Sequence, residues 1–150
     1  MQVRAANIDD LDVLVEFTTR QVRESEGAIK AAGTIRDGIG QALADSSLSL
    51  YWILEVDGAV VGSASALRTW SDWNAGYYWW LQSMYLEPEH RGQGGMRKLV
   101  DAIKTAMVAE SGLELRIYLN KDNEAAIAAY TAAGFQKSVY EIMVWVDDAT

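Results

Sequence analysis

The chain has 150 residues, a length typical of one domain. Half of its residues are hydrophobic and 23% are charged, a balance that excludes a disordered or collagen-like protein. It contains no cysteine and a single histidine, His90. This composition excludes a disulfide framework, a cysteine nucleophile and a zinc site built from several histidines.

The formal net charge is −8, which disfavours a nucleic-acid-binding protein because such proteins need a basic surface. Within this acidic chain, the segment from His90 to Lys98 holds three cations and no acid. A small basic patch of this kind suits a polyanionic ligand. The apolar runs are too short to cross a membrane and the N-terminus lacks a signal pattern, so we expect a cytoplasmic protein without a membrane partner.

The first half of the chain predicts a strand, two helices and three strands. Asn7 or Asp9 is expected to cap the first helix. Asp57-Gly58 predicts a two-residue hairpin turn, because both central residues of such a turn need positive φ. The expected segments are a strand at Val3–Ala6, a helix through Leu11–Phe17, a break at Glu24–Gly27, a helix at Thr34–Ala44, strands at Leu50–Val56 and Ala59–Leu67, a loop at Trp70–Gly76 and a strand at Tyr77–Leu86.

The second half alternates helices and strands. Apolar residues from Met96 to Met107 recur at i, i+3, i+4, i+7 and i+11, which predicts a helix. A strand at Leu113–Leu119 follows, then a helix capped by Asp122 or Asn123 that ends at Gly134, and a final strand pair within Phe135–Val146. This order predicts an α/β (α+β) single domain over residues 1–150, with a mixed, mostly antiparallel sheet of about seven strands and about four helices on its faces.

A glycine-rich loop, Arg91–Gly95, joins the strand that ends at Leu86 to the helix that begins near Met96. Glycine allows a ligand to approach the backbone closely, and a helix N-terminus offers free N–H groups and partial positive charge. The loop therefore favours a pyrophosphate site, although a turn that merely starts a helix remains the alternative. The glycine spacing matches neither the P-loop nor the dinucleotide-binding fingerprint.

Two motifs resemble those of the GNAT superfamily of N-acetyltransferases. Arg91-x-x-Gly94, after the strand end YLEPEHRGQG, is similar to the family's coenzyme A signature, Gln/Arg-x-x-Gly-x-Gly/Ala, with Met96 in the last position. The segment NKDNEAAIAAYTAAGF resembles the family's Asn-x-x-Ala-x-x-x-Tyr-x-x-x-Gly-Phe helix. The opening strand and helix also fit the family, so the resemblance covers essentially the whole chain.

The resemblance implies that the substrates are acetyl-CoA and a small amine, and that the acetyl group passes directly between them without a metal. Strands Leu81–Leu86 and Leu113–Leu119 are expected to part and admit the pantetheine arm, with an N–H near Tyr85 polarising the thioester carbonyl. Tyr130 is the candidate general acid, with an ordinary core tyrosine as the alternative. The implied cofactor-binding residues are Met84, Tyr85, Leu86, Arg91, Gly92, Gln93, Gly94, Gly95, Met96, Arg97, Asn120, Asn123, Ala126 and Tyr130.

The resemblance does not identify the general base. Many relatives carry a glutamate on the strand before the cofactor loop, where this chain has Gln82 and then Ser83, and neither accepts a proton from an ammonium ion at neutral pH. Glu24, Glu26 and Asp72 are favoured because their segments resemble acceptor-lining regions of the superfamily, and Glu26 and Asp72 are the leading candidates. Glu55 and a water chain to backbone carbonyls are the alternatives.

Six aromatic residues occur within eleven positions, from Trp70 to Trp80. Some must be core, while others would line a cleft that attracts a cationic amine by cation–π interaction. The first functional hypothesis is an N-acetyltransferase for such an amine. The alternatives are a non-catalytic acyl-CoA sensor of the same fold and an interaction module that uses this aromatic surface. The apolar segment Val139–Val146 also suggests a homodimer.

Overall fold

The computed structural model describes residues 1–27 and 30–147. They form two compact units, residues 1–118 and the remainder from Leu119 onward, and each is described by itself. The first unit contains strands β1 (Gln2–Ala5), β2 (Leu50–Val56), β3 (Ala59–Ser71), β4 (Gly76–Leu86) and β5 (Leu115–Arg116), and helices α1 (Leu11–Glu26), α2 (Ala32–Ala44) and α3 (Gly95–Ala109), with 3-10 turns at Ile8–Asp10 and Pro88–His90. The second unit contains helix α4 (Glu124–Ala132).

The five strands form one mixed sheet in the order β1-β2-β3-β4-β5. The first three pairings are antiparallel and the β4–β5 pairing is parallel. The mixed, mostly antiparallel sheet and the four α-helices are confirmed, but the prediction of about seven strands is wrong for the described residues. The missing strands are those expected within Phe135–Val146.

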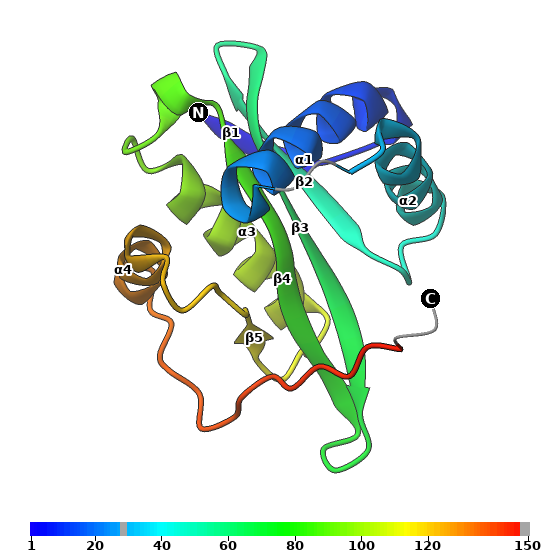
Figure 1. Ribbon diagram of the computed structural model, residues 1–150, viewed down its shortest axis with the longest axis vertical. Coiled ribbons are helices and arrows are strands. Elements are labelled where there is room, and N and C mark those ends of the chain that lie inside the picture. Colours follow the sequence, from blue (N-terminus) through cyan, green and yellow to red (C-terminus); the bar gives the residue numbers. More distant parts are fainter. Residues whose placement is uncertain (28–29, 148–150) are drawn as a thin grey trace. The chain divides into compact units, whose positions relative to one another are not determined.

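Helices cover both faces of the sheet (Figure 1). Ile53 and Leu54 are consecutive in β2 and therefore point to opposite faces. Ile53 packs with Leu14 of α1 and Ile39 of α2. Gly95, at the start of α3, lies so close to Leu54 that an added Cβ would meet its Cδ2 atom at 2.7 Å. The sheet is thus sandwiched between α1 and α2 on one face and α3 on the other.

Local sequence signals place several of the chain reversals. Asp57 and Gly58 both have positive φ, as the predicted hairpin turn requires. The expected break at Glu24–Gly27 is wrong in extent, because α1 continues to Glu26 and ends at Gly27, which takes a left-handed conformation. The expected loop at Trp70–Gly76 is also too long. Cross-strand pairing extends β3 to Ser71 and starts β4 at Gly76, so a four-residue turn remains.

The second unit has one regular element within its described residues. Asn123 caps α4, and the N–H of Ala126 donates to its Oδ1 atom at 3.1 Å. Residues 135–147 form no strand, and the side chains of Val139, Met143 and Trp145 are more than four-fifths exposed. Apolar, β-branched composition favours a strand but supplies no hydrogen-bonding partner, which explains the wrong strand prediction. The predicted role of this segment in a homodimer stays a prediction.

A buried carboxylate ties β1 to the turn before α1. Asp10 is 5% exposed, and its two oxygens accept from the Arg4 guanidinium at 2.8 Å each. Asp10 Oδ2 also accepts from the backbone N–H of Asn7, and Arg4 Nε donates to Glu55 at 2.8 Å. The hydrogen bonds from Arg4 hold the pKa of Asp10 below its ordinary value. The ionised carboxylate therefore stabilises the fold.

Replacing Asp10 with asparagine is expected to lower the free energy of unfolding by about 2–3 kcal/mol at pH 7, because it leaves Arg4 without its main buried partner. A lowered pKa contributes stability above the ordinary carboxyl value and loses it as pH falls below that value. The difference between wild type and Asp10→Asn should therefore shrink from pH 7 to about pH 3.

Urea denaturation at both pH values measures this difference. Asp12→Asn is the matched control, because Asp12 also binds an arginine, Arg36, but its side chain is 83% exposed. The control should lose less than about 1 kcal/mol. Equal losses for the two variants at pH 7 would contradict the assignment.

Candidate cofactor and acyl-transfer site

The loop between β4 and α3 places a helix N-terminus beside the end of the central strand. Gly92 has a φ of 73° and Gly94 a φ of 86°, and an added Cβ at either position would meet no atom within 4 Å. Their backbone conformation, not lack of space, therefore requires glycine. Gly94 is the N-cap of α3 and no side chain caps this terminus. The free N–H groups of the first turn are thus available to an anion.

Gly95 has a different role from its two neighbours in the loop. An added Cβ would lie 2.6 Å from Leu86 Cδ2 and 2.7 Å from Leu54 Cδ2. This glycine therefore allows α3 to pack closely against β2 and the end of β4. Gln93 folds back onto the preceding turn, where its Nε2 donates to the carbonyl of Glu89 at 2.7 Å. Met96, the departure from the family motif, is half-buried.

Strands β4 and β5 pair over only two positions, Trp79 with Leu115 and Trp80 with Arg116. Beyond them, β4 continues its pairing with β3 as far as Leu86. Within the part of the chain that the structure describes, no strand pairs with Leu81–Leu86 on the side away from β3. The predicted parting of the two strands thus begins after Trp80 and Arg116. It leaves the segment Met84–Leu86 on an open edge.

The C-terminal half of α1 lies against this end of β4. Arg91 Nη2 lies 2.9 Å from Glu24 Oε2, and Arg91 Nε donates to the carbonyl of Leu86 at 2.9 Å. Tyr85 is 4% exposed, with its ring centroid 4.9 Å from that of Phe17 and 5.5 Å from the Arg91 guanidinium carbon. The Tyr85 side chain is therefore part of the packing. Its backbone faces β3: Glu87, two residues further on, donates its N–H to the carbonyl of Val61 at 2.9 Å, and a Cβ added at Gly62 of β3 would lie 2.8 Å from the Tyr85 carbonyl. Because successive residues of a strand point their N–H groups to opposite sides, those of Met84 and Leu86 point to the open edge.

The structure does not bring the candidate general bases together. Glu24 pairs with Arg91, and Glu55 pairs with Arg4. Glu26 is exposed at the end of α1 and makes no ion pair with a described residue. Asp72 is exposed in the β3–β4 turn. At about 3.3 Å per residue, this turn lies more than about 20 Å along β4 from the segment that begins at Ser83.

A row of hydroxyl groups crosses the sheet beside the open edge. Tyr51, Ser65 and Ser83 are direct cross-strand neighbours on β2, β3 and β4. Burial raises the pKa of the Tyr51 phenol, and the nearby hydroxyls of Ser49 and Ser65 offset part of that rise. The sequence alone does not predict this row, because the cross-strand neighbours of Ser65 depend on the strand register.

The aromatic cluster divides into three groups. Trp79 is fully buried, as core packing predicts. Trp70 and Tyr77 form an edge-to-face pair with centroids 5.1 Å apart, and Trp73 is 87% exposed in the turn. Tyr78 and Trp80 are half-buried beneath the Arg116 guanidinium, whose carbon lies 3.5 Å and 5.7 Å from the two ring centroids. The chain's own cation thus occupies the aromatic surface nearest the open edge.

In the second unit, α4 carries the other motif. Asn123 and Tyr130 are seven residues apart, which places them on the same side of the helix. Tyr130 is 7% exposed, and its ring meets that of Phe135 edge-to-face at 5.5 Å. Burial raises the pKa of Tyr130 to about 12, so the phenol keeps its proton at neutral pH. Asn120 Oδ1 accepts from the N–H of Asp122 at 3.0 Å, so it stabilises the turn before the helix.

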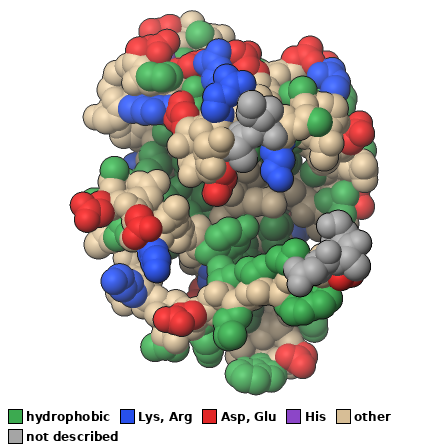
Figure 2. All heavy atoms as spheres, viewed as in Figure 1, with side chains coloured by type: hydrophobic (Ala, Val, Ile, Leu, Met, Phe, Trp, Pro, Cys, Tyr) green, Lys and Arg blue, Asp and Glu red, His purple; other side chains and the backbone are tan. Residues whose placement is uncertain are grey.

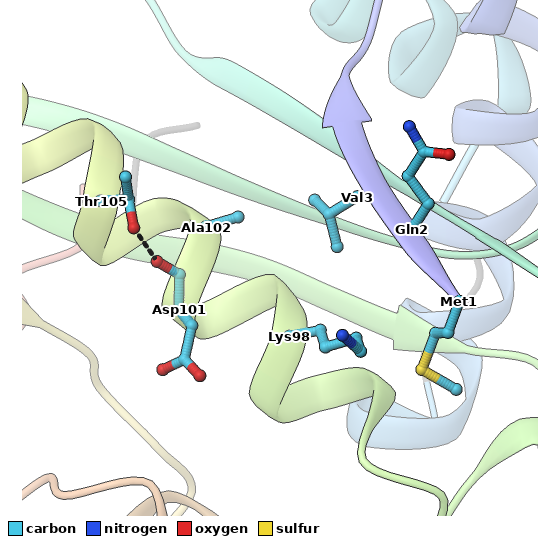
Figure 3. Close-up of a pocket in the computed structure, with 7 residues that line it drawn as sticks. All are labelled: Met1, Gln2, Val3, Lys98, Asp101, Ala102 and Thr105. Carbon is cyan, nitrogen blue, oxygen red and sulfur yellow. Dashed lines mark hydrogen bonds between the residues drawn. The ribbon is translucent and has the colours of Figure 1, made fainter.

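A separate hollow of about 310 Å³ lies between β1 and α3 (Figure 3). Its lining includes Val3, Lys98 and Asp101, and the Thr105 hydroxyl donates to the carbonyl of Asp101. It contains none of the predicted loop glycines or open-edge residues. Within the described residues, no cluster of three or more acidic or histidine side chains could hold a metal ion. No helix there is long and apolar enough to cross a membrane.

Comparison with known protein families identifies the family of this chain. A model of the acetyltransferase (GNAT) family matches residues 16–135. The chain belongs to the GNAT acetyltransferase family. Comparison with curated proteins gives no match.

Solved structures agree with the GNAT fold. A "possible acetyltransferase" from Clostridium difficile 630 is 28% identical, with a TM-score of 0.91 over 97% of each chain. A "predicted acetyltransferase with acetyl-CoA" from Clostridium acetobutylicum is 21% identical, with a TM-score of 0.77 over 95% of this chain and 94% of the other. An aminoglycoside 6'-N-acetyltransferase from Acinetobacter haemolyticus is 18% identical, with a TM-score of 0.79 over 98% of this chain and all of the other.

Proposed function

We propose that the chain is an acetyl-CoA-dependent N-acetyltransferase that transfers an acetyl group directly to a small amine. One observation carries this proposal. The uncapped N-terminus of α3, entered through two left-handed glycines, adjoins the open edge of β4. Such an arrangement offers N–H groups to a pyrophosphate and backbone hydrogen bonds to an extended arm. Acetyl-CoA contains both groups, and one solved structure of the same fold contains acetyl-CoA.

The residues from Arg91 to Arg97 would bind the pyrophosphate, and Met84–Leu86 would pair with the pantetheine arm. Asn120, Asn123 and Ala126 are proposed contacts from the second motif. Arg91 forms an ion pair with Glu24, so pyrophosphate binding would replace a carboxylate partner with a phosphate. On the face that Figure 2 shows, acidic and basic side chains are interspersed over α1 and α2.

In the reaction, the free amine attacks the thioester carbonyl, a C–N bond forms and the C–S bond breaks. The proposed donor to the developing oxyanion is an N–H beside Tyr85 that faces the open edge, that of Met84 or Leu86. The amine nitrogen loses a proton and the departing sulfur gains hydrogen bonding or a proton. We assign the donor role at sulfur to Tyr130.

The proton from the amine needs an acceptor. Glu26 is the proposed base, acting through water, because it is exposed and makes no ion pair with a described residue. Asp72 remains a second proposal, although its turn lies at the other end of β4. The hydroxyl row of Tyr51, Ser65 and Ser83 could hydrogen-bond the neutral amine but does not supply a base at neutral pH.

A non-catalytic acyl-CoA sensor is the second candidate. It is favoured by Gln82 and Ser83, which leave β4 without a carboxylate beside the open edge. Both candidates predict acetyl-CoA binding, and the absence of cysteine suits either protein in a reducing cytoplasm.

Thiol release from acetyl-CoA with a panel of amines separates the two candidates. The enzyme should release thiol only with an acceptor present, and mass spectrometry should find one acetyl group on the acceptor. Because amides resist hydroxylamine and esters do not, a product that survives hydroxylamine identifies N-acetylation. Binding of acetyl-CoA without release by any amine would favour the sensor, and a hydroxylamine-labile product would contradict transfer to nitrogen.

A further inference from the structure

We propose that the acceptor amine carries a carboxylate, and that Arg116 recognises it. The proposal rests on the N-acetyltransferase function proposed above and names the acceptor's class. Its basis is a surface formed by Thr69, Tyr78, Trp80 and Arg116, with Tyr118 beside it, which we call the Arg116 surface.

The Arg116 surface lies where β4 and β5 part. Trp80 and Arg116 form the last pair of that two-residue ladder. Ser83 is three residues further along β4, or about 10 Å at strand rise. At Ser83 the open edge approaches the predicted thioester position. The surface is therefore at the closed end of the opening, within reach of a small molecule whose amine is at the thioester.

The surface faces the same side of the sheet as α1. Ser63 pairs with Tyr85, whose ring contacts Phe17 of α1, so Ser63 points to the α1 face. Thr69 is six residues further along β3 and points the same way, because side chains alternate. Trp80 Nε1 donates to Thr69 Oγ1 at 3.2 Å, which places the Trp80 ring on that face too. The other arginine of these strands, Arg68, lies over Trp79 on the opposite face.

The guanidinium is held in place by the rings beneath it. Its carbon lies 3.5 Å from the Tyr78 centroid and 5.7 Å from that of Trp80. The Tyr78 hydroxyl accepts from Asn74 Nδ2 at 2.9 Å, which fixes the ring. A substrate ammonium group would meet a fixed positive charge here instead of an open aromatic face. A substrate carboxylate would meet an oriented planar donor.

The present partner of Arg116 is easily replaced. Arg116 Nη2 lies 3.0 Å from Glu114 Oε1, and the Glu114 side chain is 56% exposed. Exposed ion pairs of this kind contribute little to stability, because water screens the two charges. A guanidinium has five N–H donors, so an incoming carboxylate can share or replace Glu114. Glu114 then competes with the acceptor for Arg116.

The test compares matched pairs of acceptors, ω-amino acids of two to five carbons and their amides, which differ in the carboxylate alone. For the best pair, we expect kcat/KM of the acid to exceed that of the amide at least tenfold. Arg116→Met should reduce this ratio to about one, and Arg116→Lys should retain part of it. Glu114→Gln should raise kcat/KM for the acids and leave the amides unchanged.

Lys104→Met, on α3, is the control for net charge and should keep the wild-type ratio. Equal rates for acids and amides in every pair would overturn the inference, as would an unchanged ratio in a folded Arg116→Met protein. If Arg116→Met does not fold, unchanged rates for the acids in Glu114→Gln overturn it instead. Turnover of amides without acid preference leaves the N-acetyltransferase proposal standing. Absence of turnover with every amine contradicts that proposal and this inference together.

Discussion

Turnover of the Tyr130→Phe variant is expected to fall at least tenfold, with little change in acetyl-CoA affinity. The substitution removes the hydroxyl and keeps the ring, which packs edge-to-face on Phe135. General acid catalysis typically contributes about 10²–10⁴-fold, and water can replace part of it. The affinity for acetyl-CoA should stay unchanged because a thioester sulfur is a poor hydrogen-bond acceptor in the ground state.

The raised pKa of Tyr130 determines how its hydroxyl can assist departure of the thiolate. A phenol with a pKa of about 12 and a thiol with a pKa of about 8.5 make full transfer to a free thiolate uphill by about 5 kcal/mol. A hydrogen bond that strengthens as charge develops on sulfur is therefore the expected role. Such a bond acts in the transition state and raises kcat, not affinity.

Steady-state turnover and calorimetric titration with acetyl-CoA measure the two effects separately. Tyr77→Phe is the matched control, because Tyr77 is 47% exposed at the start of β4 and lies outside both motifs. Full activity in Tyr130→Phe would remove the residue from the mechanism. A parallel loss of affinity would assign it to cofactor binding instead.

Replacing Gly94 with valine is expected to raise the dissociation constant for acetyl-CoA at least tenfold, a loss of about 1.4 kcal/mol. Gly94 has a φ of 86°, which a β-branched residue rarely adopts. The valine would therefore shift the backbone of the loop and turn N–H groups away from the pyrophosphate. The loss should appear in affinity more than in kcat.

Gly58→Val tests whether this loss is specific. Gly58 has a φ of 81° in the β2–β3 turn, and an added Cβ there, as at Gly94, would meet no atom within 4 Å. Both variants should therefore lose similar stability from backbone strain. Only Gly94→Val should lose acetyl-CoA affinity. Wild-type affinity in a folded Gly94→Val protein would contradict a phosphate site in this loop.

Signals that are local in the sequence predicted much of the fold. The apolar spacing from Met96 to Met107 predicted α3, and Asp57-Gly58 predicted the hairpin, because each pattern specifies the conformation of its own residues. The strands expected within Phe135–Val146 were wrong because a strand also needs a partner, which local composition does not supply.

The arrangement of the candidate site depends on the register of the sheet, which local sequence patterns do not specify. A shift in the β3–β4 pairing between Ser65 and Ala66 leaves Gln82 without a cross-strand partner. This bulge puts Ser83 opposite Ser65, and the separate pairing of β4 with β5 puts Trp80 beside Arg116. No spacing in the sequence indicates either arrangement. The motif glycines were predicted, whereas the pairing of Arg91 with Glu24 came from packing of α1 against β4.

Calorimetric titration of the wild-type protein with acetyl-CoA tests the central claim most directly. We expect saturable binding of one acetyl-CoA per chain, through the α3 N-terminus and the open edge of β4. Bound ligand should also raise the unfolding temperature, because it stabilises the folded state alone. Absence of saturable heat, together with an unfolding temperature that acetyl-CoA does not change, would contradict the account.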